Sequence, residues 1–204
     1  MLFDDTYKTI TSQSVGIYRE KGSKFIATAI PIQSEQQVKD EINQVAKRYH
    51  DARHHCYAYR LGFDGSIQRY NDDGEPSGTA GRPIMGQILS NELTLVLIVV
   101  TRYFGGTKLG VSGLIQAYKT ASKEALVVAS IVDCFVKEVY ELKFDYGQMS
   151  LVMNKLKTSP ANILFNKFET DCSIVFSIRK SLADQTIEPL SKIDNSNLTF
   201  LRYE

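Results

Sequence analysis

The stretch that decides the fold runs from Leu93 to Gly110 and reads LTLVLIVVTRYFGGTKLG. Its first part, Leu93–Val100, is apolar almost without a break, which predicts a β-strand buried on both faces of a sheet. A polar, glycine-rich loop follows. A long amphipathic helix is then expected from about residue 113 to residue 129, with Ser112 as its N-cap. The loop should therefore lie at the end of a central strand, where ligands often bind.

Strand patterns on the N-terminal side of this stretch complete a first domain, which we assign to residues 1–132. Ser14–Tyr18 and Lys24–Ile32 alternate as a strand pair joined by a turn. Two further strands are expected at residues 55–61 and 66–70.

Three helices are expected in the same domain. The first follows Ser34, an N-cap with which Gln37 completes a capping box. The second is short and carries Pro83 in its first turn. The third is the long helix after the glycine-rich loop. Their core-facing residues are predicted to be Val38, Ile42, Val45 and Tyr49, then Ile84, Ile88 and Leu89, and finally Leu114, Tyr118, Ala121, Ala125 and Val128.

The remaining residues, 133–204, predict a second domain with a different pattern. Its order is β-α-β-β-α-β, which is typical of a ferredoxin-like domain. Ser181 is expected to cap the second helix, and Pro189 to kink or end it. The expected strands are residues 140–144, 163–168, 172–178 and 198–202, and the expected helices cover residues 147–157 and those after Ser181. The fold class is thus α+β.

Bulk composition excludes several classes of protein. The chain has 204 residues and a formal net charge of +1, so no global charge draws it to nucleic acid or membrane. Its 3 cysteines, Cys56, Cys134 and Cys172, form no C-x-x-C pair, which fits a reducing compartment. The first 13 residues lack the pattern of a signal peptide, and no apolar run is long enough to span a bilayer. We therefore expect a cytoplasmic protein with no membrane partner.

The polar stretch at residues 71–83 is the first candidate for function. Its acids, Asp72, Asp73 and Glu75, suit Mg²⁺ binding or general acid and base catalysis. The run Asn-Asp-Asp-Gly is equally ordinary turn chemistry. A third interpretation is that the acids pair with Arg102, Arg82 or Arg53 and fix a rigid surface without catalysis. Ser77, Thr79 and the backbone N–H groups near Gly78 and Gly81 complete the candidate set.

The loop at residues 101–113 is the second candidate. Backbone N–H groups and a helix N-terminus attract phosphate or carboxylate. Arg102 and Lys108 add charge, and a guanidinium can bind an anion with two parallel hydrogen bonds. Tyr103 could stack on a base. The three glycines of this loop would also suit a tight turn, and the spacing is that of neither a P-loop nor a dinucleotide fingerprint.

The third candidate is the run Arg53-His54-His55-Cys56. On a strand, His54 and Cys56 face one side and His55 the other. A Cys–His nucleophile would need a third, orienting group, and none is evident. A cysteine packed in a half-buried strand explains the pattern more simply. His50, His54 and Cys56 have no standard zinc spacing.

The two loop motifs together resemble the Impact/YigZ family. The resemblance rests on residues 71–83 (NDDGEPSGTAGRP), on Thr101–Gly106 (TRYFGG) with Leu109 and Gly110, and on the His-Cys strand. It implies that the first domain has the fold of ribosomal protein S5 domain 2 and that the second is similar to the last domain of elongation factor G. It also implies a link to translation, because the eukaryotic relatives are translational regulators that bind a protein partner of a stress kinase. The bacterial branch has no settled activity.

From these patterns we expect a non-enzymatic binding protein that acts in translation or its regulation and binds RNA or the ribosome. One alternative is a regulator that binds a protein partner through the same surface. The other is a hydrolase or phosphotransferase that uses loop carboxylates. No cofactor, metal or catalytic residue is assigned. The expected binding residues are Arg53, His54, Asp72, Asp73, Glu75, Ser77, Thr79, Arg82, Arg102, Tyr103, Gly105, Gly106, Lys108 and Ser112.

Overall fold

A computed structural model describes residues 5–169 and 171–204, which form two compact units. The first unit is Tyr7–Cys134, and the second groups Asp5 and Thr6 with Phe135–Glu204. The sequence analysis instead placed the N-terminal residues in the first domain. Among the described residues, no helix is both long and apolar enough to cross a membrane.

A five-stranded antiparallel sheet forms the centre of the first unit, in the order β2-β3-β6-β4-β5. The middle strand, β6, is buried at every position except its last, Tyr103. This confirms the predicted strand with two buried faces, although it begins at residue 96 and extends through 103. The strands are β2 (Ser14–Glu20), β3 (Ser23–Pro31), β4 (His54–Leu61), β5 (Ile67–Asn71) and β6 (Val96–Tyr103).

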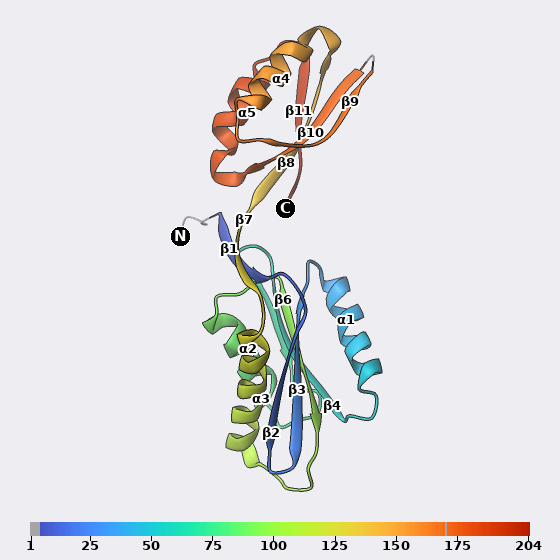
Figure 1. Ribbon diagram of the computed structural model, residues 1–204, viewed down its shortest axis with the longest axis vertical. Helices are drawn as coiled ribbons and strands as arrows, with labels where there is room; N and C mark the ends of the chain where they lie inside the picture. The colour runs from blue at the N-terminus through green and yellow to red at the C-terminus, as the bar shows by residue number, and fades with distance from the viewer. Residues whose placement is uncertain (1–4, 170) are drawn as a thin grey trace. The chain divides into compact units, whose positions relative to one another are not determined.

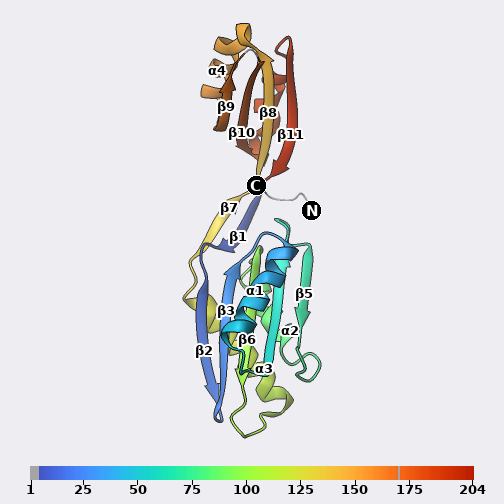
Figure 2. The ribbon, with the colours of Figure 1, turned by 90° about the vertical axis from the view of Figure 1, so that its right-hand side faces the viewer.

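Helices cover both faces of this sheet (Figure 1). α1 (Glu35–Arg48) packs on one face, and α2 (Gly81–Ser90) with α3 (Gly110–Val127) packs on the other (Figure 2). Because side chains alternate along a strand, even-numbered β6 residues such as Ile98 face α2 and α3. Odd-numbered β6 residues such as Val99 face α1.

The first helix begins as predicted. The Ser34 hydroxyl accepts a hydrogen bond from the Gln37 N–H at 3.2 Å. The Gln37 side chain in turn accepts from the N–H of Gln33, at 2.9 Å, rather than from that of Ser34. The second half of the capping box is therefore shifted by one residue. The predicted apolar face of α1 is confirmed by its packing against the sheet.

Two expectations about the other helices are wrong. α3 begins at Gly110, so Ser112 lies inside its first turn and no side chain caps the helix. Leu89 and Val128 were expected to face the core but are 42% and 63% exposed. Leu89 lies in the last turn of α2, and Val128 lies just beyond the last residue of α3. At these two helix ends the 3.6-residue repeat therefore does not predict which side chains are buried.

A two-stranded sheet of β1 (Thr6–Ile10) and β7 (Ile131–Phe135) was not anticipated. Both strands are only 5 residues long, and neither pattern alternates clearly between apolar and polar residues. The pairing therefore depends on long-range contacts that local periodicity cannot reveal.

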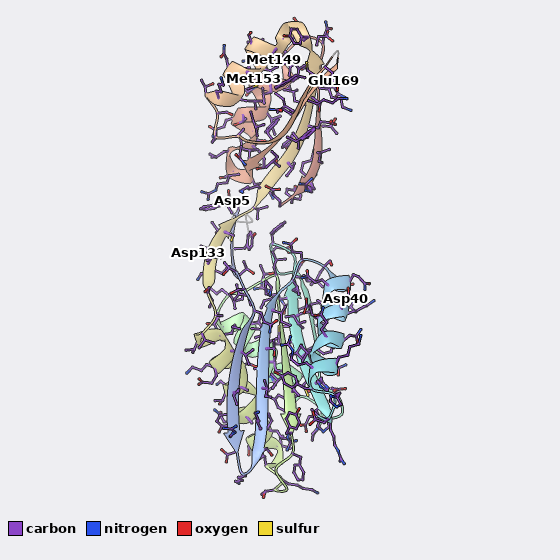
Figure 3. All side chains as sticks on the ribbon, turned by 45° about the vertical axis from the view of Figure 1, so that its right-hand side comes forward. Asp5, Asp40, Asp133, Met149, Met153 and Glu169 are labelled. Carbon is purple, nitrogen blue, oxygen red and sulfur yellow. The ribbon has the colours of Figure 1, made fainter. Side chains whose placement is uncertain are left out.

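The second unit has the expected order of elements, and its four-stranded sheet has the strand order β11-β8-β10-β9. Helices α4 and α5 pack on one face of this sheet through one apolar cluster. In α4, Val152 and Leu156 are buried, and Met149 and Met153 pack against the same cluster (Figure 3). The elements are β8 (Lys137–Asp145), α4 (Met149–Lys157), β9 (Asn162–Phe168), β10 (Asp171–Arg179), α5 (Ala183–Ser191) and β11 (Ser196–Tyr203).

Ser181 does not cap α5, so that expectation is wrong. It lies in a 3₁₀ turn, Lys180–Leu182, that precedes the helix. Its N–H instead donates to the carboxylate of Asp5 at 3.1 Å, and Asp5 also forms an ion pair with Arg179. Pro189 lies inside α5, which continues for two residues beyond it.

Candidate functional site

A buried ion pair joins the acidic glycine-rich loop to the end of β6. Arg102 Nη1 donates to Glu75 Oε1 at 2.6 Å, and the two side chains are only 8% and 4% exposed. Pairing between a loop acid and Arg102 was one of the interpretations from sequence, and this contact confirms it. Arg102 itself lies within β6, on the face toward α2 and α3, and not in a loop. Its burial and its carboxylate partner argue against the predicted contact with phosphate at the surface.

Glu75 also ends a chain of buried hydrogen bonds. The Tyr118 hydroxyl donates to Glu75 at 2.8 Å, and the Cys56 thiol lies 3.3 Å from the Tyr118 oxygen. Burial raises the pKa of Cys56 to about 12, so the thiol stays protonated at neutral pH. Burial, together with Cys56 and Glu75, also raises the pKa of Tyr118 far above its usual range. Cys56 is thus a packed core residue and not a nucleophile.

The other two loop acids are bound within the loop and to β4. The Asp72 carboxylate accepts hydrogen bonds from the N–H groups of Gly78, Ala80 and Gly81, at 2.8, 3.0 and 2.8 Å. Burial alone would raise the pKa of Asp72, but these hydrogen bonds outweigh it and hold the pKa below its usual value. Asp72 therefore occupies the N-terminus of α2, where a phosphate could otherwise bind. Asp73 accepts from the His55 N–H at 2.6 Å.

His54 contacts this loop rather than Cys56. Its Nδ1 lies 2.7 Å from the carbonyl oxygen of Asp73. A carbonyl only accepts, so Nδ1 carries the proton and donates this hydrogen bond. The Cys56 sulfur contacts the carbonyl oxygen of Asp72 and the Tyr118 hydroxyl instead. The strand alternation predicted for His54, His55 and Cys56 is confirmed, because His55 contacts Tyr49 near the end of α1.

The loop after β6 packs tightly against the turn between β2 and β3. A Cβ on Gly105 would collide with the backbone of Gly22 and Ser23, so only glycine fits there. The Gly105 N–H donates to the Ser23 hydroxyl at 3.1 Å. The Gly105 N–H is therefore not free to bind an anion, so the anion-binding role predicted for it from sequence is wrong. Gly106 has a φ of +87° and open space around it.

A cleft lies at the end of β6, and we call it the β6-end cleft. It has a volume of about 560 Å³. On its rim the Tyr103 hydroxyl donates to Asp51 at 2.7 Å, which lowers the pKa of Asp51. Phe104 is 57% exposed, with the Arg102 guanidinium 5.7 Å from its ring centre. The cleft is lined by Asp51, Ala52, Arg53, His54, Arg102, Tyr103 and Phe104.

The remaining predicted residues lie around this surface. Arg53, Lys108, Ser112 and Ser77 are exposed, and Arg82 is exposed with its Nε donating to the Tyr70 hydroxyl at 3.2 Å. Thr79 is buried, and its hydroxyl donates to the Pro76 carbonyl at 2.6 Å, so it shapes the loop. Asp51, Phe104 and Tyr118 were not among the site residues predicted from sequence. Phe104 could have been found from its position directly after Tyr103, whereas Tyr118 was assigned to the core alone.

The loop carboxylates are held by the protein, whereas two cations and one aromatic ring near them are exposed. Within residues 5–169 and 171–204, no three His, Cys, Asp or Glu side chains gather as a metal site. The carboxylates of Asp72, Asp73 and Glu75 all accept hydrogen bonds from the protein. The three acids that the sequence suggested for metal binding or catalysis therefore have structural roles. Arg53, Lys108 and Phe104, in contrast, are exposed to solvent.

The buried pair of Arg102 and Glu75 ties the acidic loop to the central strand just before the second glycine-rich loop, and both loops lie within the part of the chain that a family model matches. A model of the Impact N-terminal domain matches residues 21–126. The chain belongs to the IMPACT family.

Curated relatives agree with this placement. The chain is 38% identical over 137 residues to the IMPACT family member YvyE of Bacillus subtilis, covering 67% of this chain and 63% of that protein. It is 33% identical over 132 residues to the IMPACT family member YigZ of Escherichia coli, covering 64% and 65%. The match thus spans slightly less than two thirds of either relative. A crystal structure of a hypothetical protein aligns over 98% of both chains with a TM-score of 0.72 and 25% identity.

Proposed function

We propose that this protein is a non-enzymatic binding protein that acts in translation or its regulation, and that the β6 end of its first unit contacts RNA or the ribosome. One observation carries the proposal. At this end of the sheet the loop acids accept hydrogen bonds from the protein, whereas Arg53 and Lys108 are exposed and form no side-chain hydrogen bond or ion pair with any described residue. Exposed cations beside bound acids favour an anionic partner.

Fold-level analogy supports the link to translation. We infer the fold of ribosomal protein S5 domain 2 for the first unit and a ferredoxin-like fold, similar to the last domain of elongation factor G, for the second. The strand order β11-β8-β10-β9 and the β-α-β-β-α-β connection support the second assignment. Such analogy raises the expectation of ribosome binding but does not replace evidence from the site.

The test is a salt titration of binding to purified ribosomal RNA and to ribosomes. Cations that contact phosphates release counterions, so the logarithm of the binding constant should fall linearly with the logarithm of salt concentration. Arg53→Gln and Lys108→Gln should each reduce the magnitude of this slope by about 0.7 to 0.9. Lys123→Gln, an exposed lysine on the outer face of α3, is the matched control and should leave the slope unchanged. Absence of binding at low salt would refute the RNA assignment.

A protein partner is the second candidate, and one observation favours it. Val111 and Ile115 lie four residues apart on α3, close in sequence to Lys108, and are 60% and 39% exposed. An apolar pair beside a cation suits a protein interface. Co-purification with and without nuclease separates the two proposals, because only a protein complex survives the nuclease.

A further inference from the structure

The end of the first-unit sheet carries an uncompensated pair of like charges. Arg19 in β2 lies directly opposite Lys24 in β3. Like charges directly opposite each other destabilise a sheet. Within the described part of the chain, neither side chain forms a hydrogen bond or an ion pair. Contacts within the protein therefore do not explain why two cations lie opposite each other, whereas the binding of a negatively charged ligand would explain it.

The strand register places the end of β6 in line with Arg19 and Lys24 across the sheet, and the start of β4 next to it. Lys24 lies opposite Tyr103 of β6, and His54 of β4 lies opposite Arg102. Neighbouring strands are about 4.8 Å apart, so Arg19 and Tyr103 lie roughly 10 Å apart along the row. Arg53 directly precedes β4 and lines the β6-end cleft beside Tyr103. We call Arg19, Lys24 and Arg53 the cationic row.

An exposed aromatic ring lies in the cleft that Arg53, the last member of this row, also lines. Phe104 lines the same cleft and is 57% exposed. The Arg102 guanidinium lies 5.7 Å from its ring centre, and Arg102 is fixed in turn by Glu75. The ring is therefore supported from the protein side while much of its surface faces solvent. A flat apolar surface beside phosphate-binding cations is what an unpaired base requires.

We propose that the cationic row and Phe104 form a binding site for single-stranded RNA, in which the row contacts successive phosphates and Phe104 stacks on one base. This inference rests on the proposed function and adds to it the form of the RNA. A duplex keeps its bases stacked inside, so it would use the cations but not the ring. Asp51 is the one carboxylate among the residues that line the cleft, and the Tyr103 hydroxyl holds it on the rim.

The experiment measures fluorescence anisotropy of the full chain with a labelled oligouridine decamer and with an RNA duplex of the same length. Phe104→Ala should weaken binding of the single strand about 10-fold and leave its salt slope unchanged, because stacking releases no counterions. Lys24→Gln and Arg19→Gln should each reduce the magnitude of the slope by about 0.7. Neither row variant should lower the unfolding temperature, because each removes a like-charge repulsion.

Matched controls exclude general effects of charge and hydrophobicity. Phe165→Ala removes a phenylalanine that is 60% exposed in β9 of the second unit, and it should not change binding. Lys123→Gln again serves as the control for charge.

Three results decide the matter. Preference for the single strand, with loss on Phe104→Ala, supports the inference. Equal affinity for the two RNAs, or unchanged binding by Phe104→Ala, overturns it, and the proposed function survives if Arg53→Gln still reduces the slope. No binding of either RNA by the parent chain overturns both.

Discussion

The two glycine-rich loops of the first unit look alike in sequence but differ in structure. In the acidic loop, residues 71–80, each carboxylate accepts hydrogen bonds from the protein. In the basic loop, residues 104–109, Lys108 and Thr107 are exposed and form no side-chain hydrogen bond with any described residue. The acidic loop is therefore a structural brace, whereas the basic loop leaves Thr107 and Lys108 exposed to solvent.

The difference arises from where each loop meets the core. The acidic loop turns inward at Glu75, whose side chain is 4% exposed and contacts Arg102 on the α2 and α3 face of the sheet. The basic loop contacts the protein through the backbone of Gly105, which packs against Gly22, and through Leu109, which packs against the core, while Lys108 between them is exposed. Polar glycine-rich composition predicts a loop in both places but does not distinguish a buried brace from an exposed surface.

The largest expected effect comes from breaking the buried pair in the brace. Arg102→Ala leaves Glu75 buried without its cation and should lower the free energy of unfolding of the first unit by about 3–5 kcal/mol. Hydrogen exchange of β6 peptides reports this quantity, because core strands exchange through global opening. Arg82→Ala removes an exposed arginine from the same region and should leave this free energy almost unchanged.

Replacing both Glu75 and Arg102 is the control that tests whether the loss of stability comes from an unpaired buried charge. The double variant Glu75→Leu with Arg102→Met removes both charges and should recover most of the loss. If Arg102→Ala costs no more than Arg82→Ala, the acidic loop is not a brace and the comparison fails.

A smaller effect is expected at Asp72, where the charge binds backbone amides. Asp72→Asn should cost about 2 kcal/mol at neutral pH, because hydrogen bonds to a charged group are weakened. The folded pKa of Asp72 lies below its unfolded value of about 3.9. Its stabilisation is therefore complete above that pH and is lost as the pH falls through the folded pKa.

The measurement is urea unfolding as a function of pH. Between about pH 5 and pH 2 the parent should lose this contribution, whereas Asp72→Asn should show a flatter profile over the same range. Asp40→Asn is the matched control, since Asp40 lies on the solvent side of α1 (Figure 3). Parallel profiles for the parent and Asp72→Asn would contradict the proposed role of the carboxylate.

Much of the fold could be predicted from sequence because its signals are local. The apolar run of β6, the Ser34 cap and the alternation of β4 each lie within a few residues. The pairing of β1 with β7 could not, because it joins segments more than 120 residues apart. The charged pair of Arg19 and Lys24 lies within a predicted hairpin, but the first strand was expected to end at Tyr18, and its extension to Glu20 is what places the two residues opposite each other.

The proximity of the acidic loop to Arg102 could be predicted from sequence, whereas the burial of the residues involved could not. Arg102 was chosen for its charge and its position after a buried run. Sequence does not show that the strand extends through residue 103, which turns Arg102 toward the core and Tyr103 toward the α1 face. A shift of two or three residues in a strand end thus changes a surface cation into a buried one.

The smallest effect on stability is expected in the basic loop, and it is the sharpest test of the comparison. Lys108→Gln should change the free energy of unfolding by less than about 0.5 kcal/mol, because no described residue pairs with the side chain. The same variant should reduce the magnitude of the salt slope of RNA binding by about 0.7 to 0.9. Asp72→Asn should do the reverse, with a clear loss of stability and an unchanged slope. If Lys108→Gln destabilises the first unit as much as Asp72→Asn does, then the basic loop is a second brace, and its exposed lysine is no evidence for an anionic partner.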